Sequence, residues 1–166
     1  MAVATVLDRD LFRKTCGRFA TGIAVTTVSG PDGLPYGLTV NSFTSVSAIP
    51  PLVLICVDYR STLLPYFRAS ASYCVNVLAK HQRTLSERFS ERIPDRFEGL
   101  VWTPGELGAP VLEDCLASME CSVTQTVEAG DHAIFIAEVV RAKYRDGEPL
   151  LYFGSDYRVI RERTVD

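Results

Sequence analysis

Short runs of apolar and β-branched residues alternate with turns rich in glycine, proline and aspartate along most of this chain. Such runs favour strands, and turn residues at short intervals join strands into hairpins. Strands are predicted at residues 23–28, 34–40, 52–57, 73–78, 119–126, 132–143 and 150–153, the last of the chain. The near-continuous apolar run 52–57 indicates a strand buried on both faces or inside a barrel. Many strands at short intervals predict a mainly β protein built as an antiparallel barrel.

A few short helices and one long loop are predicted between the strands. Helices are expected after Asp8, at residues 62–68 and at residues 81–89. Asp8 can cap the first helix, and Pro65 is tolerated only in the first turn of the second. Residues 93–110 carry three prolines and three glycines. They predict a largely irregular loop, of the kind that often serves as a lid or a binding segment.

Composition and charge narrow the class of protein. The 166 residues suit one domain, long enough to bury roughly 70% of the surface of the unfolded chain. Net charge is −3 and Lys and Arg are scattered, which disfavours binding to nucleic acid or to an anionic membrane. No apolar run approaches the roughly 20 residues of a membrane helix, and the N-terminus lacks the features of a signal peptide, so we expect a cytoplasmic protein. Five cysteines without a Cys-x-x-Cys and two histidines without ligand spacing predict neither a disulfide framework nor a metal site.

The most informative segment is residues 37–58, where a row of small polar side chains runs through a double proline into an apolar strand. The row comprises Thr39, Asn41, Ser42, Thr44, Ser45 and Ser47. Such residues compete with regular strand pairing and leave backbone donors free for a ligand. The row is typical of a cradle for a planar, phosphate-bearing molecule; the alternative is a Ser/Thr-rich strand or turn without a ligand. The chain has no dinucleotide glycine fingerprint, P-loop or nucleophile elbow, so a nucleotide must be held by other means.

Four segments, in a fixed order, carry a resemblance to a known family. They are residues 18–27 (Arg-Phe-Ala-Thr-Gly-Ile-Ala-Val-Thr-Thr), residues 37–51, Gly130-Asp131-His132 with residues 134–139, and residues 149–153 (Pro-Leu-Leu-Tyr-Phe). Together they resemble the short-chain flavin reductases, the reductase components of two-component flavin-dependent monooxygenases. The resemblance covers roughly residues 8–160 and implies a single flavin reductase-like domain over residues 1–166. The implied fold is an antiparallel split β-barrel (FMN-binding split barrel), usually a homodimer with flavin near the subunit interface.

The activity that this resemblance implies is hydride transfer from NADH or NADPH to FMN or FAD. Reduced flavin then passes to a separate monooxygenase. Because hydride transfer needs the two rings within about 3–3.5 Å, the site must hold the flavin edge and its phosphate and leave one face open for the nicotinamide. Two alternatives remain: a non-catalytic flavin-binding or delivery protein, and another FMN-dependent oxidoreductase on the same barrel, such as a pyridoxamine-phosphate oxidase-like protein.

The resemblance also assigns flavin contacts to particular residues. The ring and ribityl chain are expected against Thr39, Val40, Asn41, Ser42, Phe43, Ser45, Val46 and Ser47, many of them through backbone N–H groups. The phosphate is expected at a helix start formed by Asp58, Arg60, Ser61 and Thr62, where the helix dipole favours an anion. The alternative there is a plain helix cap with a solvated arginine. Lys80, His81 and Arg83 form a second basic cluster, either near the flavin tail or as a solvated helix start.

His132 is the candidate catalytic residue. The resemblance places it at the nicotinamide, where it would bind the carboxamide or handle a proton. Asp131 is expected to orient the turn or the histidine, and Gly130 to adopt a conformation that a side chain would forbid. Tyr157 and Phe153 either line the nicotinamide pocket or pack in the core or at a dimer interface.

Overall fold

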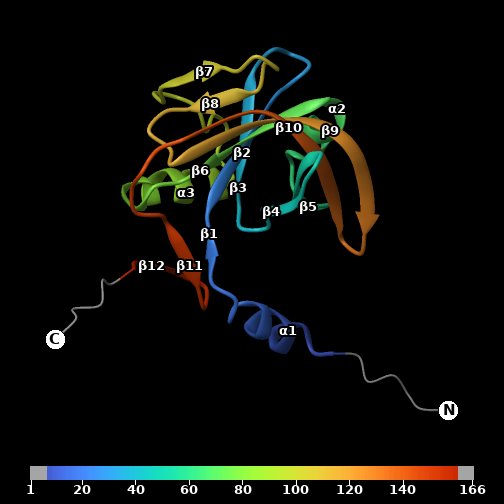
Figure 1. The fold of residues 1–166 in the computed structure, drawn as a ribbon. Coiled ribbons are helices and arrows are strands. Elements are labelled where there is room, and N and C mark those ends of the chain that lie inside the picture. Colours follow the sequence, from blue (N-terminus) through green and yellow to red (C-terminus); the bar gives the residue numbers. More distant parts are fainter. Residues whose placement is uncertain (1–6, 161–166) are drawn as a thin grey trace.

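The computed structural model describes residues 7–160, a mainly β chain with a few short helices (Figure 1). The helices are α1 (Arg9–Cys16), α2 (Leu64–Ala69) and α3 (Arg83–Ser90), and a 3-10 turn, η1 (Lys80–Gln82), precedes α3. The strands are β1 (Thr21–Gly22), β2 (Ala24–Ser29), β3 (Pro35–Val40), β4 (Thr44–Ala48), β5 (Pro51–Asp58), β6 (Ser72–Val77), β7 (Trp102–Pro104), β8 (Pro110–Leu112), β9 (Ala117–Ala129), β10 (His132–Tyr144), β11 (Leu151–Phe153) and β12 (Asp156–Arg158). Among these residues, no helix is long and apolar enough to span a membrane. The prediction about a signal peptide concerns N-terminal residues that lie outside the described ones.

Seven strands form one antiparallel sheet in the order β3-β2-β6-β9-β10-β5-β4. Its longest hairpin is β9–β10, with 13 residues in each strand, and it curves at one side of the molecule (Figure 1). Gly130 and Asp131 join the two strands, and Gly130 has a φ of +59°, in the left-handed region that favours glycine. The predicted special conformation of Gly130 is confirmed. The turn is shorter than predicted because β9 continues to Ala129.

The predicted barrel is not closed, because the two end strands of the sheet, β3 and β4, do not pair with each other in the described sheet. Leu64 and Phe67 of α2 lie in the same buried cluster as Val40 of β3 and Val53 of β5. The mainly β, antiparallel architecture is confirmed, whereas closure of the sheet into a barrel is not.

The strand β5 alternates between its two faces. Val53, Ile55 and Val57 are at most 4% exposed, whereas Leu52, Leu54 and Cys56 are half-buried. The prediction of a strand buried on both faces is therefore wrong for the single chain. The second face keeps apolar side chains partly open to solvent.

Part of the polar row forms a strand, contrary to the expectation that its small residues would avoid strand pairing. Thr44, Ser45 and Ser47 lie in β4, whereas Asn41 and Ser42 lie between β3 and β4. β4 pairs with β5, and a register shift between Ser45 and Ser47 leaves Val46 as a bulge. As the last strand of the sheet, β4 has one edge without a strand partner among residues 7–160. The backbone donors expected for a ligand are thus present at an edge and not in an irregular loop.

Two short strand pairs were missed by the sequence analysis. β7 and β8 pair inside the segment predicted as irregular, with Trp102 opposite Leu112. β12 pairs with β11, beyond the strand predicted to be the last. Three-residue strands carry too little periodicity to be recognised, and Pro104 and Pro110 occupy strand ends where proline costs no ladder hydrogen bond.

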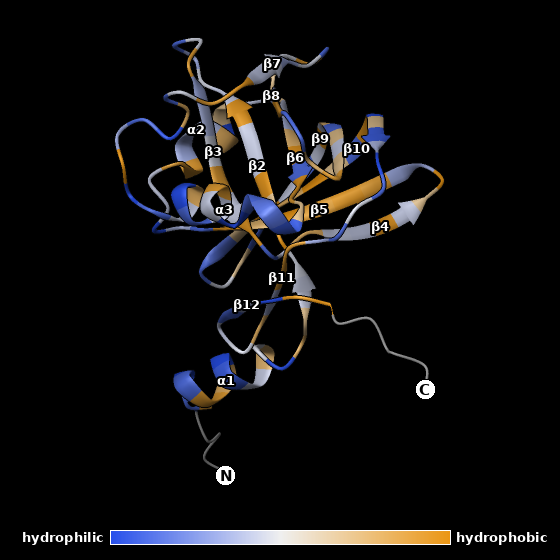
Figure 2. Cartoon of the chain, turned by 90° about the vertical axis from the view of Figure 1, so that its left-hand side faces the viewer, coloured by the Kyte–Doolittle hydropathy of each residue, from blue (hydrophilic) through white to orange (hydrophobic). Residues whose placement is uncertain are grey.

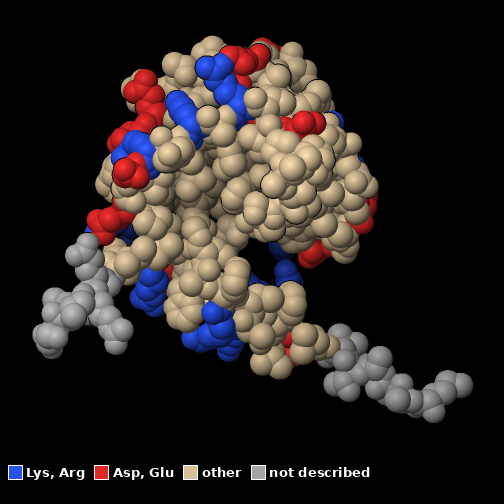
Figure 3. Space-filling view, in the orientation of Figure 1, with Lys and Arg blue, Asp and Glu red and all other residues tan. Residues whose placement is uncertain are grey.

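Helix α1 lies apart from the main sheet, beside the small sheet of β1, β11 and β12 (Figures 1 and 2). As predicted, Asp8 caps it, and its carboxylate accepts a hydrogen bond from Leu11 N at 2.8 Å. The helix buries none of its residues, and Leu11 and Phe12 are each 55% exposed. Charged side chains of both signs are intermixed on the face shown in Figure 3, as the scattered charges of the sequence suggest.

Candidate functional site

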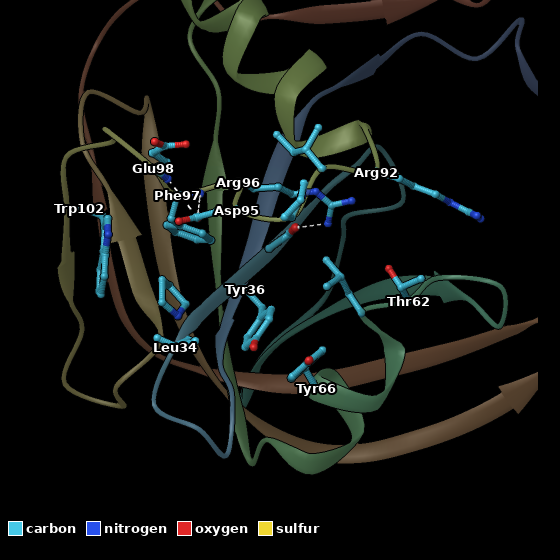
Figure 4. A pocket seen from close by; sticks show the side chains of 15 residues that line it. Leu34, Tyr36, Thr62, Tyr66, Arg92, Asp95, Arg96, Phe97, Glu98 and Trp102 are labelled. Atoms are coloured by element: carbon cyan, nitrogen blue, oxygen red, sulfur yellow. Dashed lines mark hydrogen bonds between the residues drawn. The ribbon is translucent and has the colours of Figure 1, made fainter.

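Three neighbouring cavities open on the described surface. The β12 cavity measures about 440 Å³ and is lined by Ile23, Thr39, Val40, Asn41, Arg83, Ser86, Ser90, Tyr152, Ser155, Asp156 and Tyr157. The middle cavity measures about 400 Å³ and is lined by Leu38, Thr39, Asp58, Arg60, Ser61, Thr62, Phe89, Ser90, Arg92 and Arg96. The aromatic cavity (Figure 4) measures about 710 Å³ and is lined by residues 34–37, Thr62, Leu63, Tyr66, residues 92–98 and Trp102.

Shared wall residues join these cavities into one groove. Thr39 and Ser90 line both the β12 cavity and the middle cavity. Thr62, Arg92 and Arg96 line both the middle cavity and the aromatic cavity. Cavities of this size suit small organic ligands, and a chain of three suits an elongated one.

The groove gathers about half of the residues predicted from the sequence. The β12 cavity contains Thr39, Val40, Asn41, Arg83 and Tyr157. The middle cavity contains Thr39, Asp58, Arg60, Ser61 and Thr62. The predicted residues that line none of the three cavities are Ser42, Phe43, Ser45, Val46, Ser47, Lys80 and His132.

Several hydroxyls of the polar row bind the protein's own backbone. Thr39 Oγ1 donates to Ser86 O at 2.7 Å and ties β3 to α3. Ser42 Oγ accepts from Cys56 N at 3.0 Å and donates to Cys56 O at 3.2 Å, which fixes the connection before β4. Ser47 Oγ donates to Pro50 O. These three hydroxyls therefore donate within the fold, and the flavin contacts predicted at these residues, many of them through backbone N–H groups, stay predictions.

Asp58 and Arg60 form a local ion pair. Arg60 Nη2 lies 2.6 Å from Asp58 Oδ2, and Arg60 Nε lies 3.1 Å from Asp58 Oδ1. The guanidinium holds the pKa of the Asp58 carboxyl well below its usual range, and the carboxylate raises the pKa of Arg60. Asp58 therefore shapes this loop and neutralises much of the charge that Arg60 would offer to a phosphate.

The helix start predicted at Thr62 is displaced. α2 begins at Leu64, and its N-cap, Leu63, makes no side-chain cap bond. Ser61 Oγ instead accepts from Leu63 N at 3.3 Å. Ser61 and Thr62 still line the middle cavity, so their hydroxyls reach the groove from a loop and not from a helix terminus.

Two arginines at the junction of the middle and aromatic cavities were missed by the sequence analysis. Arg96 donates from Nη1 to Gly37 O at 2.9 Å and from Nε to Glu91 O at 2.9 Å. Burial lowers its pKa, and neither Arg92 nor Arg96 has a carboxylate partner among residues 7–160. Two arginines four positions apart in a proline-containing loop were the available signal. Their charge is not neutralised locally, which makes this junction the better candidate for an anion.

The second predicted basic cluster divides between two places. Arg83 lies over the Tyr157 ring, with its guanidinium carbon 4.7 Å from the ring centroid, and the Tyr157 hydroxyl lies 3.0 Å from Ser86 Oγ. This pair forms a wall of the β12 cavity. Lys80 pairs with Glu148 at 2.9 Å and lines a separate hollow with His81. Lys80 and Arg83 therefore line different cavities in the single chain, and the exposed Lys80 corresponds to the predicted alternative of a solvated helix start.

His132 stands at the start of β10, next to the Asp58 loop. The β10–β5 register places it opposite Asp58, and Asp131 O accepts a hydrogen bond from Tyr59 N at 3.0 Å. His132 Nδ1 lies 2.6 Å from Asp131 Oδ1, and this contact lowers the pKa of Asp131. The contact fits the expected orienting role of Asp131. It leaves Nε2 of a half-exposed histidine without a hydrogen-bond partner among the described residues.

Comparison with known proteins decides the family. A family model described as "Flavin reductase like domain" matches residues 16–161. The chain belongs to this flavin reductase-like family. The match covers β1 to β12 and therefore includes all the strands around the groove.

Relatives within the flavin reductase-like family resemble the chain over most of its length. The reductase subunit HsaB of a flavin-dependent monooxygenase from Mycobacterium tuberculosis H37Rv is 39% identical over 166 residues, covering 96% of this chain and 87% of that protein. The FMN reductase (NADH) SmoA of Agrobacterium fabrum is 42% identical over 146 residues, covering 88% of this chain and 83% of that protein. The solved structure of the NADH:FAD oxidoreductase SgcE6 of Streptomyces globisporus has a TM-score of 0.89 at 36% identity, covering 98% of this chain and 99% of that one.

The residues of the groove fit the flavin that the family name implies. A flavin is a planar ring with a flexible, phosphate-bearing tail. Backbone groups at Thr39–Asn41 can serve the polar ring edge. The hydroxyls of Ser61 and Thr62, with Arg92 and Arg96, can serve the phosphate. These backbone and hydroxyl groups, together with the two arginines that have no carboxylate partner among the described residues, make the groove suitable for a flavin. The hydroxyls of β4 are not needed for this.

Proposed function

We propose that this protein is an NADH-dependent flavin reductase that reduces FMN or FAD by hydride transfer and supplies the reduced flavin to a separate monooxygenase. The observation that carries the proposal is the groove with unneutralised arginines in a chain that belongs to the flavin reductase-like family. Relatives named FMN reductase (NADH), NADH-dependent FAD reductase and reductase subunit of a monooxygenase support each part of it. NADPH remains the alternative reductant.

A bound flavin would supply the two-electron acceptor, and the protein's own residues would bind and orient the reactants. Backbone donors at the end of β3 and along β4 would stabilise negative charge on the reduced ring. Ser61, Thr62, Arg92 and Arg96 would hold the phosphate. His132, with Nδ1 fixed by Asp131, would present Nε2 to the nicotinamide carboxamide or hold a proton there.

We further propose that the protein acts as a homodimer with the single domain as its subunit. Apolar side chains that one chain leaves open support this: Val46 and Ile49 beside the β4 edge are 48% and 95% exposed, and Phe19 is 78% exposed. A second copy over β4 would bring Ser45, Val46 and Ser47 to a flavin site that the single chain leaves incomplete. A cytoplasmic location stays a prediction.

A non-catalytic flavin-delivery protein is the second candidate, because His132 lines none of the three groove cavities. The two candidates separate in one assay. Purified protein is mixed with NADH or NADPH and catalytic FMN or FAD under air, and loss of the nicotinamide absorbance is followed, with a flavin-free control. The proposal predicts flavin-dependent oxidation of at least one nucleotide. Flavin binding without nucleotide oxidation would select the delivery protein.

A further inference from the structure

The turn that carries His132 is bound to a second segment besides the two strands that it joins. Tyr59 N donates to Asp131 O at 3.0 Å, and this bond connects the turn to the loop at residues 58–62. The other residues of that loop line the middle cavity, where the flavin phosphate is proposed to lie. Because His132 is proposed to meet the nicotinamide, the relative position of the two reactants depends on how this turn lies against this loop.

Side chains join the same two segments a second time. The Tyr59 hydroxyl donates to Glu128 Oε2, and Arg68 of α2 donates from Nη2 to Glu128 Oε1 at 2.8 Å and to Oε2 at 3.0 Å. The guanidinium carbon of Arg68 also lies 5.8 Å from the centroid of the Tyr59 ring. We call Tyr59, Arg68 and Glu128 the Glu128 network. Both carboxylate oxygens accept hydrogen bonds in it, which restricts rotation of the Glu128 side chain.

The strand register places Glu128 and His132 on opposite faces of the β9–β10 hairpin. Glu128 lies opposite the fully buried Ala133, whereas His132 lies opposite Ala129 of β9 and Asp58 of β5. Cross-strand partners share a face, and successive side chains of a strand point to opposite faces. Glu128 is therefore bound on the face toward α2, and His132 is on the other. The network can fix the backbone at the turn and leave the His132 ring open to a reactant.

The exposure of the network indicates a geometric role. The side chains of Arg68 and Glu128 are 48% and 53% exposed, and ion pairs this exposed contribute little to the free energy of unfolding. A carboxylate held at both oxygens by an arginine nevertheless has a defined position. The hydrogen bond to Glu128 also raises the pKa of Tyr59, so its hydroxyl stays a donor. Hydride transfer is far more sensitive to position than stability is, because a shift of about 1 Å can slow a reaction about 100-fold.

We infer that Glu128 is a positioning residue for the proposed reaction. Bound to Arg68 and Tyr59, it fixes the turn before His132 against the loop at residues 58–62, and it thereby sets how the nicotinamide meets the flavin. The inference rests on the proposed function. It concerns the rate of hydride transfer from bound NADH, and not the affinity of the protein for flavin or NADH.

The experiment measures anaerobic flavin reduction by stopped-flow absorbance at increasing NADH, and flavin affinity by titration calorimetry. Glu128→Ala should lower the limiting reduction rate about tenfold, with the flavin Kd and the half-saturating NADH concentration within about twofold of wild type. Glu128→Gln keeps an acceptor for the Tyr59 hydroxyl and should be only about threefold slower than wild type. Glu106→Ala is the matched control, because Glu106 pairs with Arg141 toward the other end of β10 and lines none of the three groove cavities. It should reduce flavin at the wild-type rate.

Tyr59→Phe tests whether the residues of the network act as one unit. This change removes the hydroxyl and keeps the backbone bond from Tyr59 N to Asp131 O. Alone it should slow flavin reduction about threefold, and in the Glu128→Ala background it should have no further effect, because its acceptor is already gone. Two effects that multiply in the double variant would contradict the network. If Glu128→Ala does not fold, Glu128→Gln and Tyr59→Phe make the same comparison.

The remaining outcomes separate the inference from the proposed function. A limiting reduction rate for Glu128→Ala within about twofold of wild type would refute the positioning role. A slower rate accompanied by an equal loss of flavin or NADH affinity would also refute it, because Glu128 would then support binding or the fold as a whole. A wild-type protein that oxidises neither NADH nor NADPH with either flavin would refute the proposed function itself, which is a separate result.

Discussion

Asn76 is the buried amide on which the wall of the aromatic cavity depends. It lies on β6, is fully buried, and accepts a hydrogen bond at Oδ1 from Leu112 N of β8 at 2.9 Å. Its Nδ2 donates to Val25 O at 3.2 Å and to Thr27 Oγ1 at 3.3 Å. Because Leu112 pairs with Trp102 across β7 and β8, Asn76 helps to connect the hairpin that carries Trp102 to the main sheet, together with Thr27 Oγ1, which donates to Pro110 O.

Replacing Asn76 by leucine keeps the approximate volume and removes these three bonds and a weaker fourth, which Cys74 Sγ donates to Oδ1 at 3.7 Å. A buried polar group left without a partner costs about 1–3 kcal/mol. Leu112 N loses its acceptor outright, while Thr27 Oγ1 keeps its bonds to the backbone of Pro110 and Cys74. Allowing for the gain from an added apolar side chain, we expect Asn76→Leu to lower the free energy of unfolding by about 2–4 kcal/mol.

Urea unfolding at one fixed protein concentration measures this difference, since assembly would otherwise shift the midpoint. Asn41→Leu is the matched control, because Asn41 is exposed and is the other asparagine of the chain. It should change stability by less than about 0.5 kcal/mol. A loss below about 1 kcal/mol for Asn76→Leu, or equal losses for the two variants, would refute the reasoning.

Three further predictions concern the site and its loops. His132→Ala should lower kcat/KM for NADH by roughly 100-fold, with flavin affinity within about twofold of wild type. His81→Ala, at the chain's other histidine, is the control and should leave both quantities near wild type. Equal loss of flavin and NADH binding in His132→Ala would contradict the role given to His132. Ser42→Ala should lower the free energy of unfolding by about 1 kcal/mol, because it removes the two bonds to Cys56, and should leave flavin affinity unchanged. Ser45→Ala is its control. Weaker flavin binding by Ser42→Ala would show that the Ser42 hydroxyl contacts the ligand. Arg60 lowers the pKa of Asp58, so the ion pair stabilises the fold only while Asp58 is ionised. The difference in unfolding free energy between wild type and Asp58→Asn should be constant above about pH 4 and shrink at lower pH. A series of urea unfolding curves in which this difference increases as the pH falls would contradict the ion-pair account.

The sequence predicts correctly those features that depend on one residue and its near neighbours in the chain. Asp8 as a helix cap, Gly130 at positive φ and the long β9–β10 hairpin are confirmed, because capping, backbone sterics and β-branched runs act locally. It failed where the outcome depends on contacts between distant segments. The row of small polar residues is expected to resist strand pairing, yet Thr44, Ser45 and Ser47 of β4 pair with β5 around the bulge at Val46. Tertiary context here overrides a weak local preference.

The phosphate end of the groove illustrates the same limit for function. The sequence favours Arg60 because it stands next to Ser61 and Thr62, but Arg60 forms an ion pair with Asp58, two residues earlier, which compensates its positive charge. Arg92 and Arg96 lie about 30 positions later in a loop that offers no helix or strand pattern, and only folding brings them to Thr62. A cation is available to a ligand only if no carboxylate of the protein reaches it first, and that condition belongs to the three-dimensional arrangement. The position of the anion site therefore follows from which arginine remains unneutralised.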